Sequence, residues 1–168
     1  MEITSVDGFL RYWGTIRART RRVLDAIPPE RIDWSYAEGR WTLGDLVRHL
    51  ALLERWMFAE NVHGRPSLYA GCGPEHGATK DEVLALFDRL GDETATRLGA
   101  LDDAALQGRC RTPGGAELAV WKWLRAMVEH HVHHRGQIYL YLALLDVPTP
   151  PLYGLTAEEV EARSGGAG

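Results

Sequence analysis

The sequence of 168 residues is short of cysteine and of long apolar runs, and each absence argues against a class of protein. Its two cysteines, Cys72 and Cys110, lie far apart and in no metal-type spacing, which argues against a disulfide framework or a cysteine-ligated metal. No run reaches the roughly 18–20 apolar residues of a membrane span. Because residues 1–5 also lack the features of a signal peptide, we expect a cytoplasmic protein without a membrane partner.

Net positive charge is lacking as well. The chain has 19 Lys and Arg against 23 Asp and Glu, a formal net charge of -4, whereas nucleic-acid-binding domains are usually basic. We therefore expect no nucleic-acid partner and interpret the basic cluster at 17–22 as a solvated helix face. The 45% hydrophobic and 25% charged shares are typical of a globular protein, so we predict a single domain over residues 1–168.

Four long segments have the periodicity of helices, and no segment has a convincing strand pattern. Hydroxyl residues followed by an acid three positions later predict the starts of two of them. A short terminal helix should follow Thr156. Four helices joined by two longer loops predict an all-α four-helix bundle with a short C-terminal extension. The expected long helices run from about Val6 to Ile27, from Thr42 to about His63, from Thr79 to about Gly99, and from about Leu118 to Leu145.

Four of the seven histidines lie within the last long segment, between 129 and 137. At about 100° per residue, His130 and His134 fall within the apolar stripe of that helix. Their i, i+4 spacing would let two imidazoles bind one ion. His131 lies at the edge of the stripe and makes a fallback pair with His134, whereas His133 lies on the flank.

His49 is the candidate for a third ligand, because it lies near the apolar stripe of the second predicted helix. Alone, a histidine in such a position is more often a core residue that forms a hydrogen bond. Two buried histidines one turn apart are harder to explain without a metal, because each carries a desolvation cost. Three imidazoles would leave a coordination position open, as in catalytic sites, and would suit Zn, Ni, Fe or Cu.

Two more specific metal motifs do not fit. A metalloprotease helix of the H-E-x-x-H type needs a glutamate directly after its first histidine, where this chain has His131. A di-iron bundle needs Glu-x-x-His on two helices and further inward glutamates. Glu54 and Glu60 do not supply that pattern, so we expect a single ion.

The sequence resembles the DinB/YfiT-like superfamily. The resemblance rests on Trp41-Thr42 before a helix containing Arg48-His49-Leu50, on the string from Glu129 to Gln137, and on the tail from Pro150 to Thr156. It implies an antiparallel four-helix bundle, often dimeric, in which His49, His130 and His134 bind Zn or Ni. It further implies a homodimer and a chemistry based on low-molecular-weight thiols such as bacillithiol or mycothiol.

We therefore predict a metal-dependent enzyme that activates a thiol for transfer to a small-molecule substrate. A metal-dependent hydrolase and a non-catalytic, metal-binding stress-response module are the alternatives. We expect Trp56, Trp123 and Tyr141 either to line the open end of the site or simply to form core. We interpret Gln137 as an exposed helix residue, and a residue that orients a ligand or a bound water is the alternative.

Overall fold

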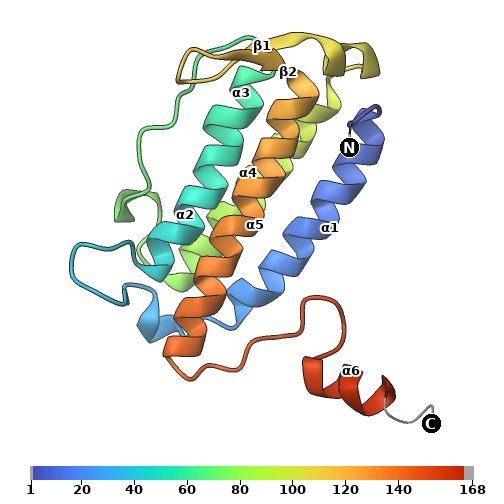
Figure 1. Cartoon of the computed structure of the whole chain (residues 1–168). Helices are drawn as coiled ribbons and strands as arrows, with labels where there is room; N and C mark the ends of the chain where they lie inside the picture. Colours follow the sequence, from blue (N-terminus) through green and yellow to red (C-terminus); the bar gives the residue numbers. More distant parts are fainter. Residues whose placement is uncertain (1, 165–168) are drawn as a thin grey trace.

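The computed structural model describes residues 2–164 and shows a four-helix bundle, as predicted (Figure 1). A short helix, α6, lies beside the lower end of the bundle and forms the expected C-terminal extension. The predicted boundaries are correct to within about two residues, apart from the end of the second helix. The helices are α1 Val6–Asp25, α2 Leu43–Leu53, α4 Lys80–Gly99, α5 Val120–Leu144 and α6 Ala157–Ser164.

The bundle does not follow a simple up-and-down order. A long loop over residues 62–79 returns from the top of the bundle to its lower end, so α2 and α4 run in the same direction (Figure 1). They are neighbours, and the antiparallel contacts are those of α4 with α1 and of α2 with α5. The pair α2 and α5, which carries the candidate histidines, is therefore one of these antiparallel pairs.

Two capping boxes start the helices that follow the long loops. Thr42 accepts a hydrogen bond from the backbone N–H of Asp45, whose carboxylate accepts one from the backbone of Thr42. Thr79 and Glu82 make the same reciprocal pair at the start of α4. These contacts satisfy N–H groups that have no partner within a helix, which is why the sequence predicted both starts correctly.

The second predicted helix is interrupted. After α2 the chain forms a π-helical turn, Glu54–Phe58, and then the short helix α3, Ala59–Asn61. A π-turn holds an extra residue, so side chains beyond Leu53 point in other directions than a regular helix predicts. Three short 3-10 helices complete the helical elements of the described residues, at Pro29–Arg31, Pro74–His76 and Asp103–Gln107.

The expectation that the chain has no strand is wrong. Two strands, β1 Arg109–Arg111 and β2 Glu117–Ala119, pair antiparallel, with Cys110 opposite Leu118. They form a small hairpin above the bundle, in the segment of the chain that connects α4 to α5 (Figure 1). Strands of three residues are too short to show an alternating pattern, so the sequence offers little signal for them.

The core consists of two apolar clusters with a polar layer between them. On α1 the upper cluster includes Phe9 and Ile16 and the lower one Val23, whereas Arg17 and Thr20 lie between them. The other bundle helices contribute to the same layer. Its buried polar side chains include Arg17, Thr20, Glu54, His131 and His134.

Glu54 is the centre of this layer, with 1% of its surface exposed. Its carboxylate pairs with Arg17 and accepts a hydrogen bond from the Trp13 indole at 3.2 Å. The Nδ1 atom of His131 lies 2.6 Å from the same carboxylate. Arg17 also donates to the carbonyl oxygen of Phe87 at 2.6 Å. Side chains or backbone of α1, α4, α5 and the π-turn therefore meet at one point.

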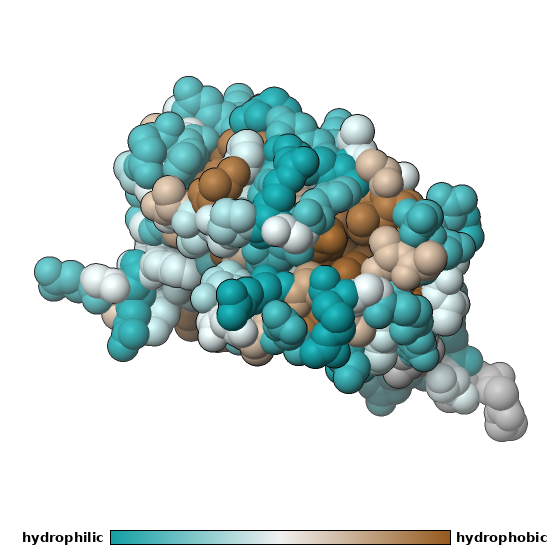
Figure 2. All heavy atoms as spheres, turned by 90° about the horizontal axis from the view of Figure 1, so that it is seen from above, coloured by the Kyte–Doolittle hydropathy of each residue, from teal (hydrophilic) through white to brown (hydrophobic). Residues whose placement is uncertain are grey.

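The surface away from this core is largely polar. Seen from above in Figure 2, the end of the bundle is mostly hydrophilic, with apolar side chains visible to the right of centre. Among the helices of residues 2–164, none is long and apolar enough to cross a membrane. Gly136 is exposed on the outer side of α5, between the exposed Val132 and Leu140, but the predicted homodimer stays a prediction.

Gly91→Ala should destabilise the protein. A Cβ atom at Gly91 would lie 2.2 Å from a guanidinium nitrogen of Arg17, which cannot move aside without losing Glu54 and Phe87. We expect a loss of about 1–3 kcal/mol in the free energy of unfolding, measured by urea denaturation. Gly14→Ala on α1 is the matched control, because a Cβ there meets nothing within 4 Å. It should stabilise the helix slightly, and equal effects of both changes would contradict the prediction.

Candidate metal centre

Three histidine side chains meet between α2 and α5. His49 comes from α2, and His130 and His134 lie one turn apart on α5. One nitrogen of each lies within 4.8 Å of the other two, and the Nε2 atoms of His49 and His130 are 3.0 Å apart. Zn–N bonds place tetrahedral ligand nitrogens about 3.3 Å apart, so small shifts would let all three bind one ion. The structure thus brings the three predicted residues together, and their role as ligands stays a prediction.

Hydrogen bonds from outside the cluster orient two of the three rings. The Nδ1 atom of His49 lies 2.8 Å from the hydroxyl of Tyr69, and Nδ1 of His134 lies 2.7 Å from Oε1 of Gln137. With Nδ1 engaged in each ring, Nε2 is left for an ion, and such outer partners are typical of metal-binding histidines. Nδ1 of His130 is buried and has no partner within residues 2–164.

The surroundings keep the imidazoles neutral. Burial, with the nearby His134, lowers the pKa of His49 to about 4. Burial and the two neighbouring rings lower the pKa of His130 to about 3. Burial also lowers the pKa of His134. Because only the neutral ring offers a lone pair to a metal, this set of donors fits a divalent ion at neutral pH.

Arg48, the neighbour of His49, fastens the loop that carries Tyr69. Its guanidinium is almost fully buried and donates to the carbonyl oxygens of Cys72 at 2.8 Å and Gly77 at 2.6 Å, and it pairs with Asp45. The loop is therefore tied to the same helix that presents His49. Neither Arg48 nor Tyr69 stands out from helical periodicity, so these supporting roles have no direct signal in the periodicity of the sequence.

The rings that lie against the histidines include those of Trp41 and Phe58, and of the predicted aromatic residues only Trp123 lies near, packed on Phe58. The Trp41 ring lies 4.5 Å from the His49 ring and 5.9 Å from that of His134, between ring centroids. Phe58 lies 5.9 Å from His130 and packs on Trp123. The other two predicted residues do not contact the cluster. Within the π-turn, Trp56 stacks on Arg55, whereas Tyr141 donates a hydrogen bond to the carbonyl oxygen of Trp41.

His131 and Gln137 differ from their predicted places. His131 is fully buried, and its two ring nitrogens contact Glu54 and Thr20, so the fallback pair with His134 does not form. Gln137 is half-buried and bonded to His134, so the favoured interpretation as an exposed helix residue is wrong. Helical periodicity placed His131 at the edge of the apolar stripe, but it could not predict the full burial of this ring, because its partners Glu54 and Thr20 lie on other elements.

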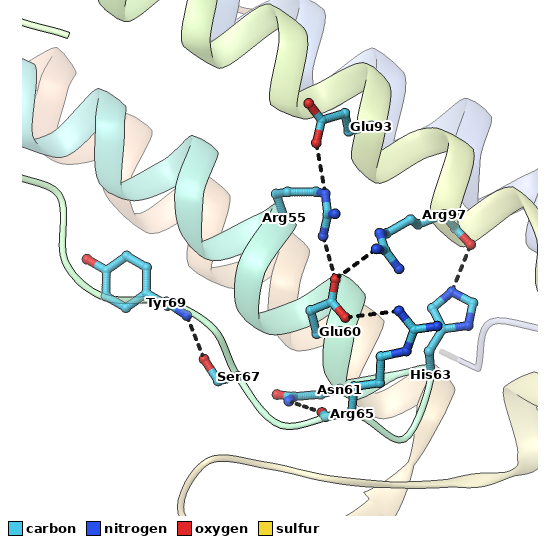
Figure 3. A network of polar contacts seen from close by, with 9 residues as sticks. All are labelled: Arg55, Glu60, Asn61, His63, Arg65, Ser67, Tyr69, Glu93 and Arg97. Carbon is cyan, nitrogen blue, oxygen red and sulfur yellow. Dashed lines mark hydrogen bonds and ion pairs between the residues drawn. The ribbon is translucent and has the colours of Figure 1, made fainter. Parts of the chain in front are cut away.

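A second charged cluster lies at the upper end of the bundle, around Glu60 (Figure 3). The buried carboxylate of Glu60 contacts Arg55 at 2.6 Å, Arg97 at 3.4 Å and Arg65 at 3.6 Å, and Arg55 also pairs with Glu93. These contacts join α3 to α4. The carboxylate of Glu60 is paired with arginines, and that of Glu54 is paired with Arg17 and His131. Neither glutamate therefore serves a di-iron site.

Comparison with known proteins identifies the family. The model of the DinB superfamily matches residues 12–138. This chain belongs to the DinB superfamily. No functionally curated protein matches its sequence.

Solved structures share the fold of this DinB-superfamily chain. A DinB-like protein from Bacillus cereus superposes with a TM-score of 0.74 at 19% identity, covering 88% of this chain and 97% of that one. YfiT from Bacillus subtilis, described as a probable metal-dependent hydrolase, gives 0.67 at 19% identity, with 85% and 89% covered. A variant of a mycothiol-dependent maleylpyruvate isomerase gives 0.64 at 15% identity, with 79% and 60% covered. At these identities the likeness shows the fold alone.

The stability of the metal-free DinB-superfamily protein should fall as the pH decreases from about 6.5 towards 4. Histidines in the unfolded chain take up protons near pH 6.5, whereas His49 and His130 in the folded protein do so only at about 4 and 3. The unfolded state therefore binds more protons in this range. In urea denaturation, the free energy of unfolding of His130→Ala should depend less on pH between 7 and 5 than that of the wild type. The exposed control His133→Ala should keep the pH dependence of the wild type. Parallel curves for wild type and His130→Ala would contradict this assignment.

Tyr69→Phe should lower the affinity for a divalent ion about tenfold, because His49 then loses the partner that fixes its ring. Zn titration against a chromophoric chelator measures the change. Tyr12→Phe is the control, since Tyr12 is an exposed tyrosine on α1. An unchanged affinity for Tyr69→Phe would show that the hydroxyl does not orient His49.

Proposed function

We propose that this chain is a metal-dependent enzyme that binds one Zn or Ni ion through His49, His130 and His134 and activates a low-molecular-weight thiol. The observation that supports it most directly is the convergence of three neutral imidazoles, two of them with Nδ1 already engaged. Three protein ligands leave a position open on a tetrahedral ion. A bound ion would supply Lewis acidity, which lowers the pKa of a thiol or water.

The choice of nucleophile follows from the groups around the histidines. Within residues 2–164 the cluster consists of histidines alone, without a carboxylate. Glu54 is the acidic group of the adjoining polar layer, and Arg17, His131 and Trp13 already occupy it. Hydrolysis of an amide requires a group that gives a proton to the leaving nitrogen. Attack of a thiolate on an electrophile has no such requirement, so the site favours thiol transfer.

A metal-dependent hydrolase is the second candidate, supported by the fold shared with YfiT. The exposed His133, whose ring centroid lies 4.9 Å from that of His134, is the candidate for exchanging protons with water in such a hydrolase. In the thiol-transfer reaction we assign no proton-transfer role to His133. Thiol transfer and hydrolysis therefore differ in their need for this residue. A metal-binding module without turnover is the third alternative.

Elemental analysis of untagged protein tests the site. We expect about one equivalent of Zn or Ni in the wild type and its loss in His49→Ala, His130→Ala and His134→Ala, because two imidazoles seldom hold an ion tightly. His133→Ala is the matched control on the same helix and should keep its metal. Wild-type protein that neither contains metal nor takes up Zn or Ni on titration would overturn the proposal.

Activity assays of the same proteins separate the candidates. Conjugation of bacillithiol or mycothiol to monochlorobimane, lost in His130→Ala and kept in His133→Ala, is the result expected for a thiol transferase. Hydrolysis of an amide such as 4-nitroacetanilide that depends on His130 and His133, without conjugation, would support the hydrolase instead. Metal-loaded protein with neither activity would favour the non-catalytic module.

A further inference from the structure

A pocket of about 490 Å³ lies beside the histidine cluster, at the lower end of the bundle. Its walls come from the loop before α2 and from the last turns of α5. A hydrogen bond from the Tyr141 hydroxyl to the carbonyl oxygen of Trp41, at 3.1 Å, joins the two walls. The pocket is large enough for a small organic molecule. The residues that line it include Tyr36, Arg40, Trp41, Gln137, Leu140 and Leu144.

The walls hold an unusual share of exposed apolar surface. Nine large hydrophobic side chains of the described residues are exposed, and four of them line this pocket. Tyr36 is 53% exposed, Trp41 42%, Leu140 59% and Leu144 56%. Single exposed hydrophobic residues need no explanation, but four around one concave site are typical of a binding surface. The pocket is therefore suited to a flat, apolar ligand.

Arg40 is the one charged residue among those that line the pocket. Within residues 2–164 its side chain forms no ion pair or hydrogen bond, in contrast to Arg17, Arg48 and Arg55. A guanidinium offers five donors in a planar fork that suits a carboxylate. An anionic group on the ligand would meet this positive charge without a competing acid in the lining.

Two lining residues also contact the histidines. Gln137 lines the pocket and accepts from Nδ1 of His134, and Trp41 lines it and lies against the rings of His49 and His134. A molecule in the pocket is thus separated from the candidate metal ligands by a single layer of side chains. The pocket can hold the part of a substrate that does not react, and its reacting end would reach the cluster once the side chain of Gln137 or Trp41 turns aside.

We propose that this pocket binds a small organic acid with a flat apolar body, whose anionic group pairs with Arg40, and that such acids are the substrate class of the site. The apolar walls supply the affinity and the guanidinium selects for the charge. The assignment as substrate rests on the proposed function, whereas the binding site itself does not.

Two fluorescent probes that differ in charge test the proposal. 8-Anilinonaphthalene-1-sulfonate carries an anion on an aromatic body, and N-phenyl-1-naphthylamine has nearly the same body without charge. Arg40→Gln should weaken binding of the anionic probe about fivefold and leave the neutral probe unchanged. Arg11→Gln, which removes the same charge from an exposed site on α1, is the matched control and should change neither. Leu144→Glu adds a negative charge to the wall and should weaken the anionic probe more than the neutral one.

The outcomes distinguish this proposal from the proposed function, because metal content is measured in the same variants. Equal affinity of the anionic probe for wild type and Arg40→Gln would overturn the pocket assignment, whatever the metal content. Charge-selective binding by a protein that contains no metal would support the proposed binding site and contradict the proposed metal-dependent enzyme. A wild-type dimer that binds neither probe and dissociates on Leu140→Glu, by light scattering, would show that a second copy covers this face, and would also overturn the proposal.

Discussion

Glu54 places a carboxylate among the four bundle helices, out of reach of water, and a buried charge is tolerated only when it is paired and hydrogen-bonded. Burial would raise the pKa of Glu54, but His131 and Arg17 hold it below its ordinary value. Loss of one partner of such a pair costs about 3–5 kcal/mol. The positions of α1, α5 and the π-turn relative to one another are therefore fixed by a single group, and a helix that slid or rotated would leave it unpaired.

This constraint also positions the candidate metal centre. His130 and His131 are adjacent on α5 and point to different partners, one to His49 and the other to Glu54. Because His131 is held by Glu54 and Thr20, the rotation of α5 is set, and His130 and His134 necessarily face α2. One imidazole thus stabilises the bundle while its neighbour faces the candidate metal centre.

Much of this arrangement was predictable from the sequence. The capping residues Thr42 and Thr79 mark helix starts through local hydrogen bonds, and the i, i+4 spacing of His130 and His134 places both on one face, so these predictions needed no knowledge of distant contacts. Predictions were less reliable beyond the start of the π-turn at Glu54. Trp56 was placed by the periodicity of a regular α-helix, and that periodicity stops at Leu53. Tyr69 and Arg40 come from loops, whose positions depend on contacts such as that of Arg48 with Cys72. Gln137 was visible in the sequence, but its bond to His134 depends on a side-chain conformation.

The three histidines lie on helices, whereas the groups that surround them, Trp41 and Tyr69, lie on the loops before α2 and after α3. Rigid helices and adaptable loops are subject to different evolutionary pressures, since insertions in loops cost little stability. Changes in these loops can therefore reshape the surroundings of the three histidines while the helices that carry them stay in place. A scaffold divided in this way is a good starting point for laboratory evolution, in which libraries confined to residues 35–41 would explore selectivity without disturbing the buried carboxylate of Glu54.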